Sequence, residues 1–181
     1  MTPSKKAQHI NWMRAVIAQH QTPLIRYARQ LVGDLDTARD VVQETFLRLW
    51  KADREQVEDH VAQWLFTVCR NRALDVRRKE GRMQSLPSHT SQTMSDERVA
   101  TPSEVVEKRQ SLAQVLKALD ALPQRQQEVL RLKFQQGLSY RQISKITGLS
   151  VSNVGYQIHA GVKALRAHVA KQDQPKSRRA S

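Results

Sequence analysis

The 181-residue chain has a single cysteine, Cys69, and only six glycines and six prolines. One thiol excludes an intrachain disulfide framework and a cysteine-rich zinc site, and it favours a reducing compartment. No run reaches the roughly 20 apolar residues that a membrane helix needs, and no apolar segment follows the first lysines as it does in a secretory signal. We therefore expect a cytoplasmic protein without membrane insertion.

Acidic residues are also in short supply. The chain has 17 Asp and Glu against 30 Lys and Arg, which gives a formal charge of +13. This surplus predicts a polyanionic partner, because neutralising phosphates releases condensed counterions and strengthens binding. An anionic membrane surface is the alternative, but no basic helix carries a Trp- and Leu-rich face for it. Nucleic acid is the favoured partner.

Patterns typical of catalysis are absent from the sequence. The six histidines are scattered without partners at metal-ligand spacing. The serines lack a His/Asp arrangement that indicates a nucleophile, and there is no glycine-rich phosphate loop. The sequence therefore gives no indication of a metal site, a cofactor or a catalytic nucleophile, although residues far apart in the chain could still meet in the fold.

Apolar residues recur every three or four positions, without sustained alternation of period two, so the chain is predicted to be all-α. Three helices are expected in the first half, over residues 10–32, 36–52 and 61–79. Pro23 should bend the first helix and Gly33 should end it. Asp36 should be the N-cap of the second helix, and Trp50 should belong to its buried stripe.

The composition changes between the two halves of the chain. Residues 83–102 are rich in Ser and Thr and contain no aromatic side chain, which is typical of a flexible tether. The sequence thus predicts two small helical domains, over residues 8–82 and 104–170, joined by a linker over residues 83–103. A basic disordered tail is expected over residues 171–181.

The second half carries a helix-turn-helix pattern. A helix over residues 124–136, with Phe134 in the core, is followed by helices over 140–147 and 151–169. Ser139 and Ser150 can cap the last two, and Gly148 can form the turn between them. Any αα-hairpin in a helical core is the alternative interpretation.

Three stretches resemble the extracytoplasmic-function (ECF) sigma factors of bacteria, which belong to the sigma-70 family: residues 40–50 (DVVQETFLRLW), residues 64–75 (WLFTVCRNRALD) and residues 119–166. The resemblance implies a transcription initiation factor that binds core RNA polymerase and catalyses no covalent chemistry. The N-terminal domain would read the −10 element of promoter DNA, and the C-terminal domain the −35 element. It also implies nucleoid association when the protein is bound to polymerase, and it makes an anti-sigma factor a candidate partner. Two alternatives remain: a stand-alone helix-turn-helix regulator, and a recombinase, for which no catalytic set is found.

The resemblance implies three sets of site residues. The polymerase-binding set lies off the core stripe of the second helix: Asp40, Gln43, Glu44, Leu47 and Arg48. The −10 set lies at the basic end of the third helix: Asn71, Arg72, Arg77, Arg78 and Lys79. The −35 set lies on the outer face of the last helix: Ser152, Asn153, Tyr156, His159 and Lys163. Arg141 of the preceding helix is added to this set as a contact to phosphate. A solvated charged face is the alternative for the first two sets, and a core or antagonist contact is the alternative for Tyr156.

The last helix departs from the family pattern. Gly155, Gln157 and Ala160 occupy matched positions where Lys or Arg is common. Because Arg is the commonest reader of guanine, we expect weaker or different guanine recognition. Asn153 would favour adenine if it reaches a base edge, and Tyr156 would suit a thymine methyl group.

Overall fold

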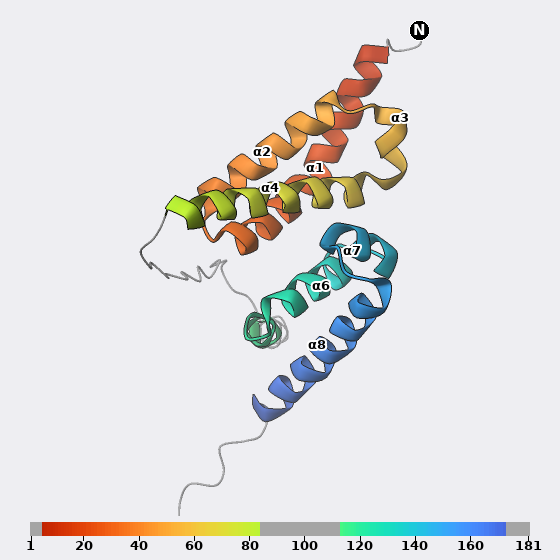
Figure 1. Cartoon of the computed structure of the whole chain (residues 1–181). Helices are drawn as coiled ribbons and strands as arrows, with labels where there is room; N and C mark the ends of the chain where they lie inside the picture. The colour runs from red at the N-terminus through yellow and green to blue at the C-terminus, as the bar shows by residue number, and fades with distance from the viewer. Residues whose placement is uncertain (1–4, 84–112, 173–181) are drawn as a thin grey trace, which may run out of the picture. The chain divides into compact units, whose positions relative to one another are not determined.

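The computed structural model describes residues 5–83 and 113–172, and every regular element in these two ranges is a helix (Figure 1). The predicted all-α class is therefore confirmed. The chain divides into two compact units. Helices α1 to α4 belong to the first unit, while α6, α8 and the larger part of α7 belong to the second. The predicted linker and basic tail fall almost entirely outside the described residues.

Helix α1 (Lys5–Val32) places apolar side chains at three- and four-residue spacing on one face. Met13, Val16 and Leu24 on this face are buried. The helix starts earlier than predicted and continues through Pro23. It ends at Gly33, whose φ of +102° lies in the left-handed region that favours glycine.

Helix α2 (Leu35–Lys51) corrects two predictions. Its N-cap is Asp34, not Asp36, because the Asp34 carboxylate accepts the Thr37 backbone N–H at 2.8 Å. Asp36 lies in the first turn and pairs with Arg39 at 3.0 Å. The prediction that Trp50 is buried is also wrong, since its side chain is 48% exposed near the end of the helix.

The chain then forms two short elements, α3 (Arg54–Val57) and η1 (Glu58–His60), before α4 (Val61–Met83). Helices α1, α2 and α4 pack against one another in pairs and lie side by side (Figure 1). Their core includes an edge-on contact between the rings of Tyr27 and Phe66, with centroids 5.2 Å apart. This three-helix arrangement leaves the outer faces of α2 and α4 exposed.

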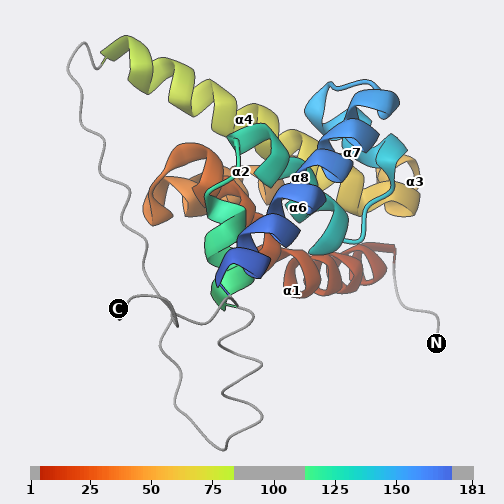
Figure 2. The same ribbon diagram turned by 90° about the horizontal axis from the view of Figure 1, so that it is seen from below.

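In the second unit, residues 113–120 are helical and precede α6 (Gln124–Phe134), α7 (Tyr140–Thr147) and α8 (Val151–Gln172). Helix α6 packs along α8 (Figure 2). The buried side chains of α6 include Val129, Leu130 and Leu132. Phe134, predicted in this core, is 66% exposed, because α6 ends at that residue and the chain turns so that Leu138 is buried instead.

The junction of α7 and α8 is the predicted helix-turn-helix. The Ser139 hydroxyl accepts the backbone N–H of Gln142 at 3.3 Å, and the Gln142 side chain accepts the Ser139 N–H at 2.9 Å, which together form a capping box. The Ser150 hydroxyl accepts the Asn153 N–H at 3.2 Å. Gly148 makes the turn with a φ of +74°. Among the described helices, none is long and apolar enough to cross a membrane.

Candidate protein and nucleic-acid interfaces

The predicted polymerase-binding residues lie along the outer face of α2. Asp40, Gln43 and Arg48 are exposed, and Glu44 is half-buried. Leu47 is 55% exposed, so this charged face carries an apolar group at its centre. Such a mixture of polar side chains around an apolar anchor is typical of a protein interface.

An apolar groove of about 510 Å³ runs between α1 and α2, beside this face. Its lining includes Met13 and Ile17 from α1, and Phe46 and Trp50 from α2. Leu47 lines the same groove, so the groove adjoins the predicted polymerase-binding residues. The sequence does not reveal this groove, because Trp50 fits the apolar stripe of α2 and α1 carries no residue with a predicted function.

Aromatic contacts hold Trp50 in position at one end of α1. The His9 ring lies edge-on to Trp50, with centroids 4.8 Å apart, and 5.7 Å from the ring of Trp12. The Arg54 guanidinium lies 5.4 Å from the centroid of Trp12, a distance at which cation–π attraction operates. The exposed Trp50 is thus supported by neighbouring side chains.

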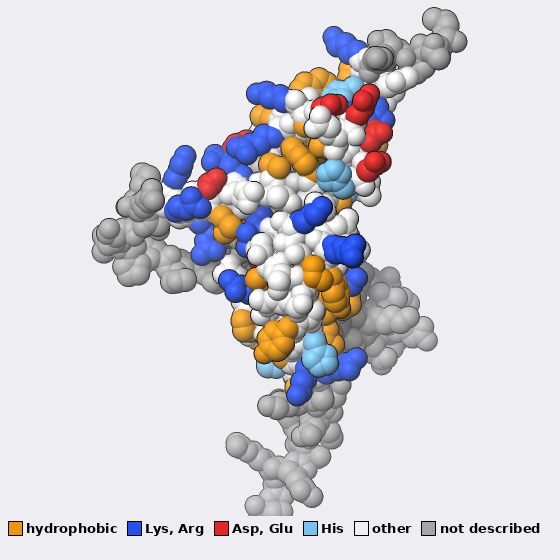
Figure 3. Space-filling view, turned by 45° about the vertical axis from the view of Figure 1, so that its right-hand side comes forward, with side chains coloured by type: hydrophobic (Ala, Val, Ile, Leu, Met, Phe, Trp, Pro, Cys, Tyr) orange, Lys and Arg blue, Asp and Glu red, His pale blue; other side chains and the backbone are white. Residues whose placement is uncertain are grey.

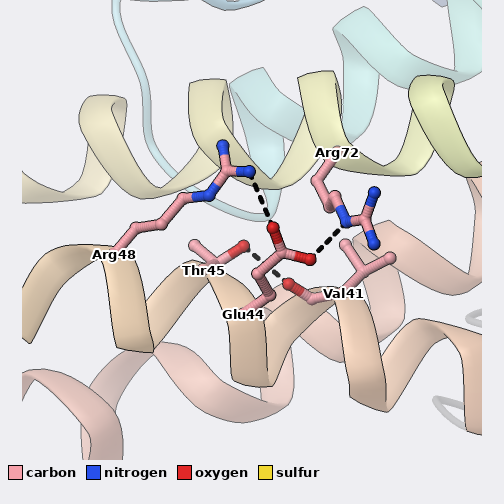
Figure 4. Close-up of polar contacts among 5 residues, drawn as sticks. All are labelled: Val41, Glu44, Thr45, Arg48 and Arg72. Atoms are coloured by element: carbon pink, nitrogen blue, oxygen red, sulfur yellow. Dashed lines mark hydrogen bonds and ion pairs between the residues drawn. The ribbon is translucent and has the colours of Figure 1, made fainter.

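Glu44 joins α2 to α4 (Figure 4). One carboxylate oxygen accepts from Arg48 at 2.7 Å, and the other forms an ion pair with Arg72. Partial burial alone would raise the pKa of Glu44, but the hydrogen bond from Arg48 and the charge of Arg72 outweigh it and lower the pKa. One turn of α2 beneath this cluster is tied by the hydroxyl of Thr45, which donates to the Val41 carbonyl at 2.8 Å.

The predicted −10 residues do not all have the same surroundings. Asn71, Arg77 and Lys79 are exposed on α4, whereas Arg72 is half-buried against Glu44. Arg78 is exposed and lies 3.4 Å from Asp75 in an ion pair. In Figure 3, Lys and Arg side chains gather over the C-terminal part of α4, and acidic side chains gather over α3 and η1. The first unit is therefore electrically polarised.

The predicted −35 residues share the outer face of α8. Ser152, Tyr156, His159 and Lys163 are exposed, and so is Arg141 on α7. Asn153 is half-buried, and its side-chain carbonyl accepts from the Gln157 amide at 3.2 Å. An amide oxygen has two lone pairs, so Asn153 can still accept through this oxygen and donate through its NH2 group.

Neither described range contains a group of three His, Cys, Asp or Glu side chains that could hold a metal ion. Cys69 is fully buried, and burial raises the pKa of its thiol to about 12, despite a hydrogen bond with Thr45 that acts in the opposite direction. The thiol is therefore protonated at neutral pH.

Comparison with known proteins identifies the family of the chain. Residues 16–83 match the family model of sigma-70 region 2, and residues 112–165 match that of sigma-70 region 4. The ECF RNA polymerase sigma factor SigL of Mycobacterium tuberculosis is 36% identical over 157 residues, which cover 85% of this chain and 86% of SigL. SigE of Mycolicibacterium smegmatis is 29% identical over 158 residues, covering 86% of this chain and 61% of SigE.

A solved structure has the same fold. It is the sigma factor RpoE of Bartonella quintana in complex with the anti-sigma factor NepR, with a TM-score of 0.60 and 23% identity over 89% of this chain and 98% of RpoE. The identity and coverage of SigL, together with both region matches, establish the family. The chain belongs to the ECF RNA polymerase sigma factors, which are promoter-directing transcription initiation factors.

Proposed function

We propose that the first unit docks on core RNA polymerase through the outer face of α2 and the adjoining groove. The observation that carries this proposal is the exposed Leu47 beside Trp50, within a ring of charged and amide groups. Exposed apolar side chains of this size mark interaction sites when they line a groove. A partner that covered them would bury both residues and leave Asp40 and Arg48 at a polar rim.

The C-terminal part of α4 is proposed to contact the −10 element. Arg77, Arg78 and Lys79 supply positive charge for the phosphate backbone. Asn71 is exposed beside them, and its amide can both donate to and accept from a base edge. Arg72 contributes from a position fixed by Glu44.

Helix α8 is proposed to enter the major groove of the −35 element. Its exposed side chains lie in the N-terminal half of the second helix of a helix-turn-helix, which is where such motifs contact base edges. Ser152, Asn153, Tyr156 and His159 would face the bases. Lys163, further along the helix, and Arg141, on α7, would contact phosphates.

The domains are proposed to fold separately over residues 8–82 and 104–170. In this assignment the protein is not an enzyme, because its role is to bind and orient the polymerase. It acts in the cytoplasm, at the nucleoid when bound to polymerase. An anti-sigma factor is proposed as a further partner, on the ground that the RpoE structure contains NepR.

The test is transcription by core polymerase freed of other sigma factors, with start sites mapped after the protein is added. Specific start sites above the core-only level are expected. Asp40→Arg should weaken binding to core polymerase, and Asn153→Ala and Tyr156→Ala should alter the preferred −35 sequence. Lys163→Ala should weaken binding to all DNA sequences alike and make the affinity for DNA less dependent on salt concentration.

Absence of specific transcripts would contradict the proposal. A footprint on a palindromic site by the protein alone would instead support the stand-alone regulator. That alternative is not favoured, because region 2 of the sigma-70 family accounts for residues 16–83.

A further inference from the structure

One edge of the outer face of α8 lacks a side chain. Ser152, Tyr156 and His159 follow one another at four- and three-residue spacing, so they share one face of the helix. All three are exposed. Gly155, three residues after Ser152, lies about 60° around the helix from it. It leaves a bare stretch of helix backbone at the edge of this face, beside the proposed reading residues.

The ring of Tyr140 covers this bare stretch. A Cβ at residue 155 would lie 3.6 Å from Cε2 and 3.9 Å from Cδ2 of Tyr140, so one edge of the ring rests on the backbone of α8. Tyr140 is the first residue of α7. Because helical side chains point toward the N-terminus of their helix, its ring extends beyond the start of α7. The side chain remains 39% exposed.

Lys133 of α6 supports the same ring from another direction. Its ammonium nitrogen lies 5.5 Å from the ring centroid of Tyr140 and donates to the Leu138 carbonyl at 3.3 Å. Cation–π attraction at this distance favours a fixed ring position. Tyr140 is therefore held before any partner binds, which reduces the ordering cost of binding.

We propose that Tyr140 contacts a thymine of the upstream promoter element and helps to determine sequence specificity. The ring of Tyr140 occupies the space that a longer side chain at residue 155 would fill. The proposal rests on the proposed role of α8 as the −35 reader. Thymine presents a C5 methyl group in the major groove, and apolar contact with this methyl distinguishes it from the other bases. An aromatic ring suits that contact because it offers a large apolar surface.

The experiment uses holoenzyme assembled from core polymerase and the full chain. Each thymine of a preferred upstream element is replaced in turn by uracil, which lacks only the methyl group. At one position, uracil should weaken binding of the unaltered protein about fivefold. Tyr140→Ala should remove this difference between thymine and uracil, whereas Tyr140→Phe should keep it.

Two further variants make the outcome decisive. Phe134→Ala removes an exposed aromatic ring from α6 and should leave the thymine preference unchanged. Gly155→Arg improves helix propensity, so it should fold, and its side chain should displace the Tyr140 ring and remove the preference. If Tyr140→Ala does not fold, Tyr140→Phe and Gly155→Arg still decide, because they make opposite predictions.

The proposal is overturned if replacing thymine by uracil weakens binding at no position. It is also overturned if a folded Tyr140→Ala or Gly155→Arg holoenzyme keeps the full difference between thymine and uracil. Asn153→Ala and Tyr156→Ala separate this failure from a wider one. If these two change the upstream preference while the Tyr140 variants do not, only the assignment of Tyr140 fails. If all of them leave the preference unchanged, α8 is not the −35 reader.

Discussion

Glu44 of α2 and Arg72 of α4 form an ion pair that connects two helices whose outer faces we assign to different partners (Figure 4). Arg48, which shares the carboxylate at 2.7 Å, belongs to the polymerase-facing set. One acidic group therefore lies between the proposed polymerase-docking face and the proposed −10 face. A substitution of Glu44 should affect both faces, whereas Asp40 on the exposed side of α2 should affect docking alone.

We predict that Glu44→Gln lowers the free energy of unfolding of the first unit by about 0.5–1 kcal/mol, because both partners are about one-third exposed and water screens the pair. Urea unfolding followed by tryptophan fluorescence measures this unit alone, since Trp12, Trp50 and Trp64 all lie in it. In a double-mutant cycle, Glu44→Gln and Arg72→Met should be non-additive. Asp36→Asn, which removes an exposed pair, is the control and should change little. Strict additivity would mean that the pair contributes nothing.

The same pair gives a pH dependence of definite sign. The folded pKa of Glu44 is lowered, so the unfolded chain binds more protons as the pH falls toward the folded value. The stabilisation is present above the unfolded pKa and is lost as the pH falls below about 4. Urea midpoints measured from pH 6 to pH 3 should decline less steeply for Glu44→Gln than for the unaltered protein. Parallel curves would contradict the assignment.

His20 should make the first unit less stable in mild acid. Its side chain is buried, and burial lowers its pKa below 6.5. The unfolded chain therefore takes up a proton near pH 6.5 that the folded chain does not, so stability decreases below that pH until the folded pKa is reached. His20→Gln should flatten the change in urea midpoint between pH 7.5 and 5.5. His60→Gln, at an exposed position, should behave like the unaltered protein; an equal effect of both variants would exclude His20 as the cause.

Gly161→Ala should destabilise the second unit. A Cβ at this position would lie 2.7 Å from Cδ1 and 3.2 Å from Cγ of Leu130, which is itself buried. We expect a packing cost of about 1–3 kcal/mol, offset by about 1 kcal/mol of improved helix propensity. Thermal unfolding followed by circular dichroism should show an earlier transition, without a change in tryptophan fluorescence.

Two variants check this explanation. At Gly155 the nearest atom to a Cβ is 3.6 Å away, so Gly155→Ala should be neutral or stabilising. Leu130→Val should partly rescue Gly161→Ala by restoring space. A Gly161→Ala protein as stable as the original would show that the Leu130 side chain moves aside without cost.

Limited proteolysis should first cut between Met83 and Pro102 and leave two resistant fragments near residues 8–82 and 104–170. The Ser- and Thr-rich composition of the segment motivates this prediction. A protease of low specificity, with fragments identified by mass, avoids dependence on the position of Lys and Arg. Early cleavage within α1 to α4 or α6 to α8, with the segment intact, would indicate that the domains do not fold separately.

Local signals predicted most of the fold. Ser139, Ser150 and Gly148 each specify a cap or a turn by their own chemistry, and the structure has all three where the sequence placed them. The predicted N-cap of α2, Asp36, is two residues too late, since the cap is Asp34. Asp34 and Asp36 have the same side chain, and only the position of the first helical turn distinguishes them.

Contacts between residues far apart in the chain could not be predicted from the sequence. Trp50 and Phe134 both fit an apolar stripe, but each lies at a helix end where the neighbouring elements no longer cover it. The Glu44–Arg72 pair and the contact of Tyr140 with Gly155 join residues on different helices. Periodicity within one helix cannot predict such pairs, because they depend on how the helices pack.

The protonated, buried thiol of Cys69 makes the chain convenient for fluorescent labelling. A thiol with a pKa of about 12 hardly reacts with maleimides at neutral pH, and this chain has no other cysteine. Cysteines introduced at the exposed positions Lys51 and Arg166 would therefore take up the dyes without removal of the native one. Energy transfer between those dyes would report the distance between the two units, free in solution and after the polymerase has bound.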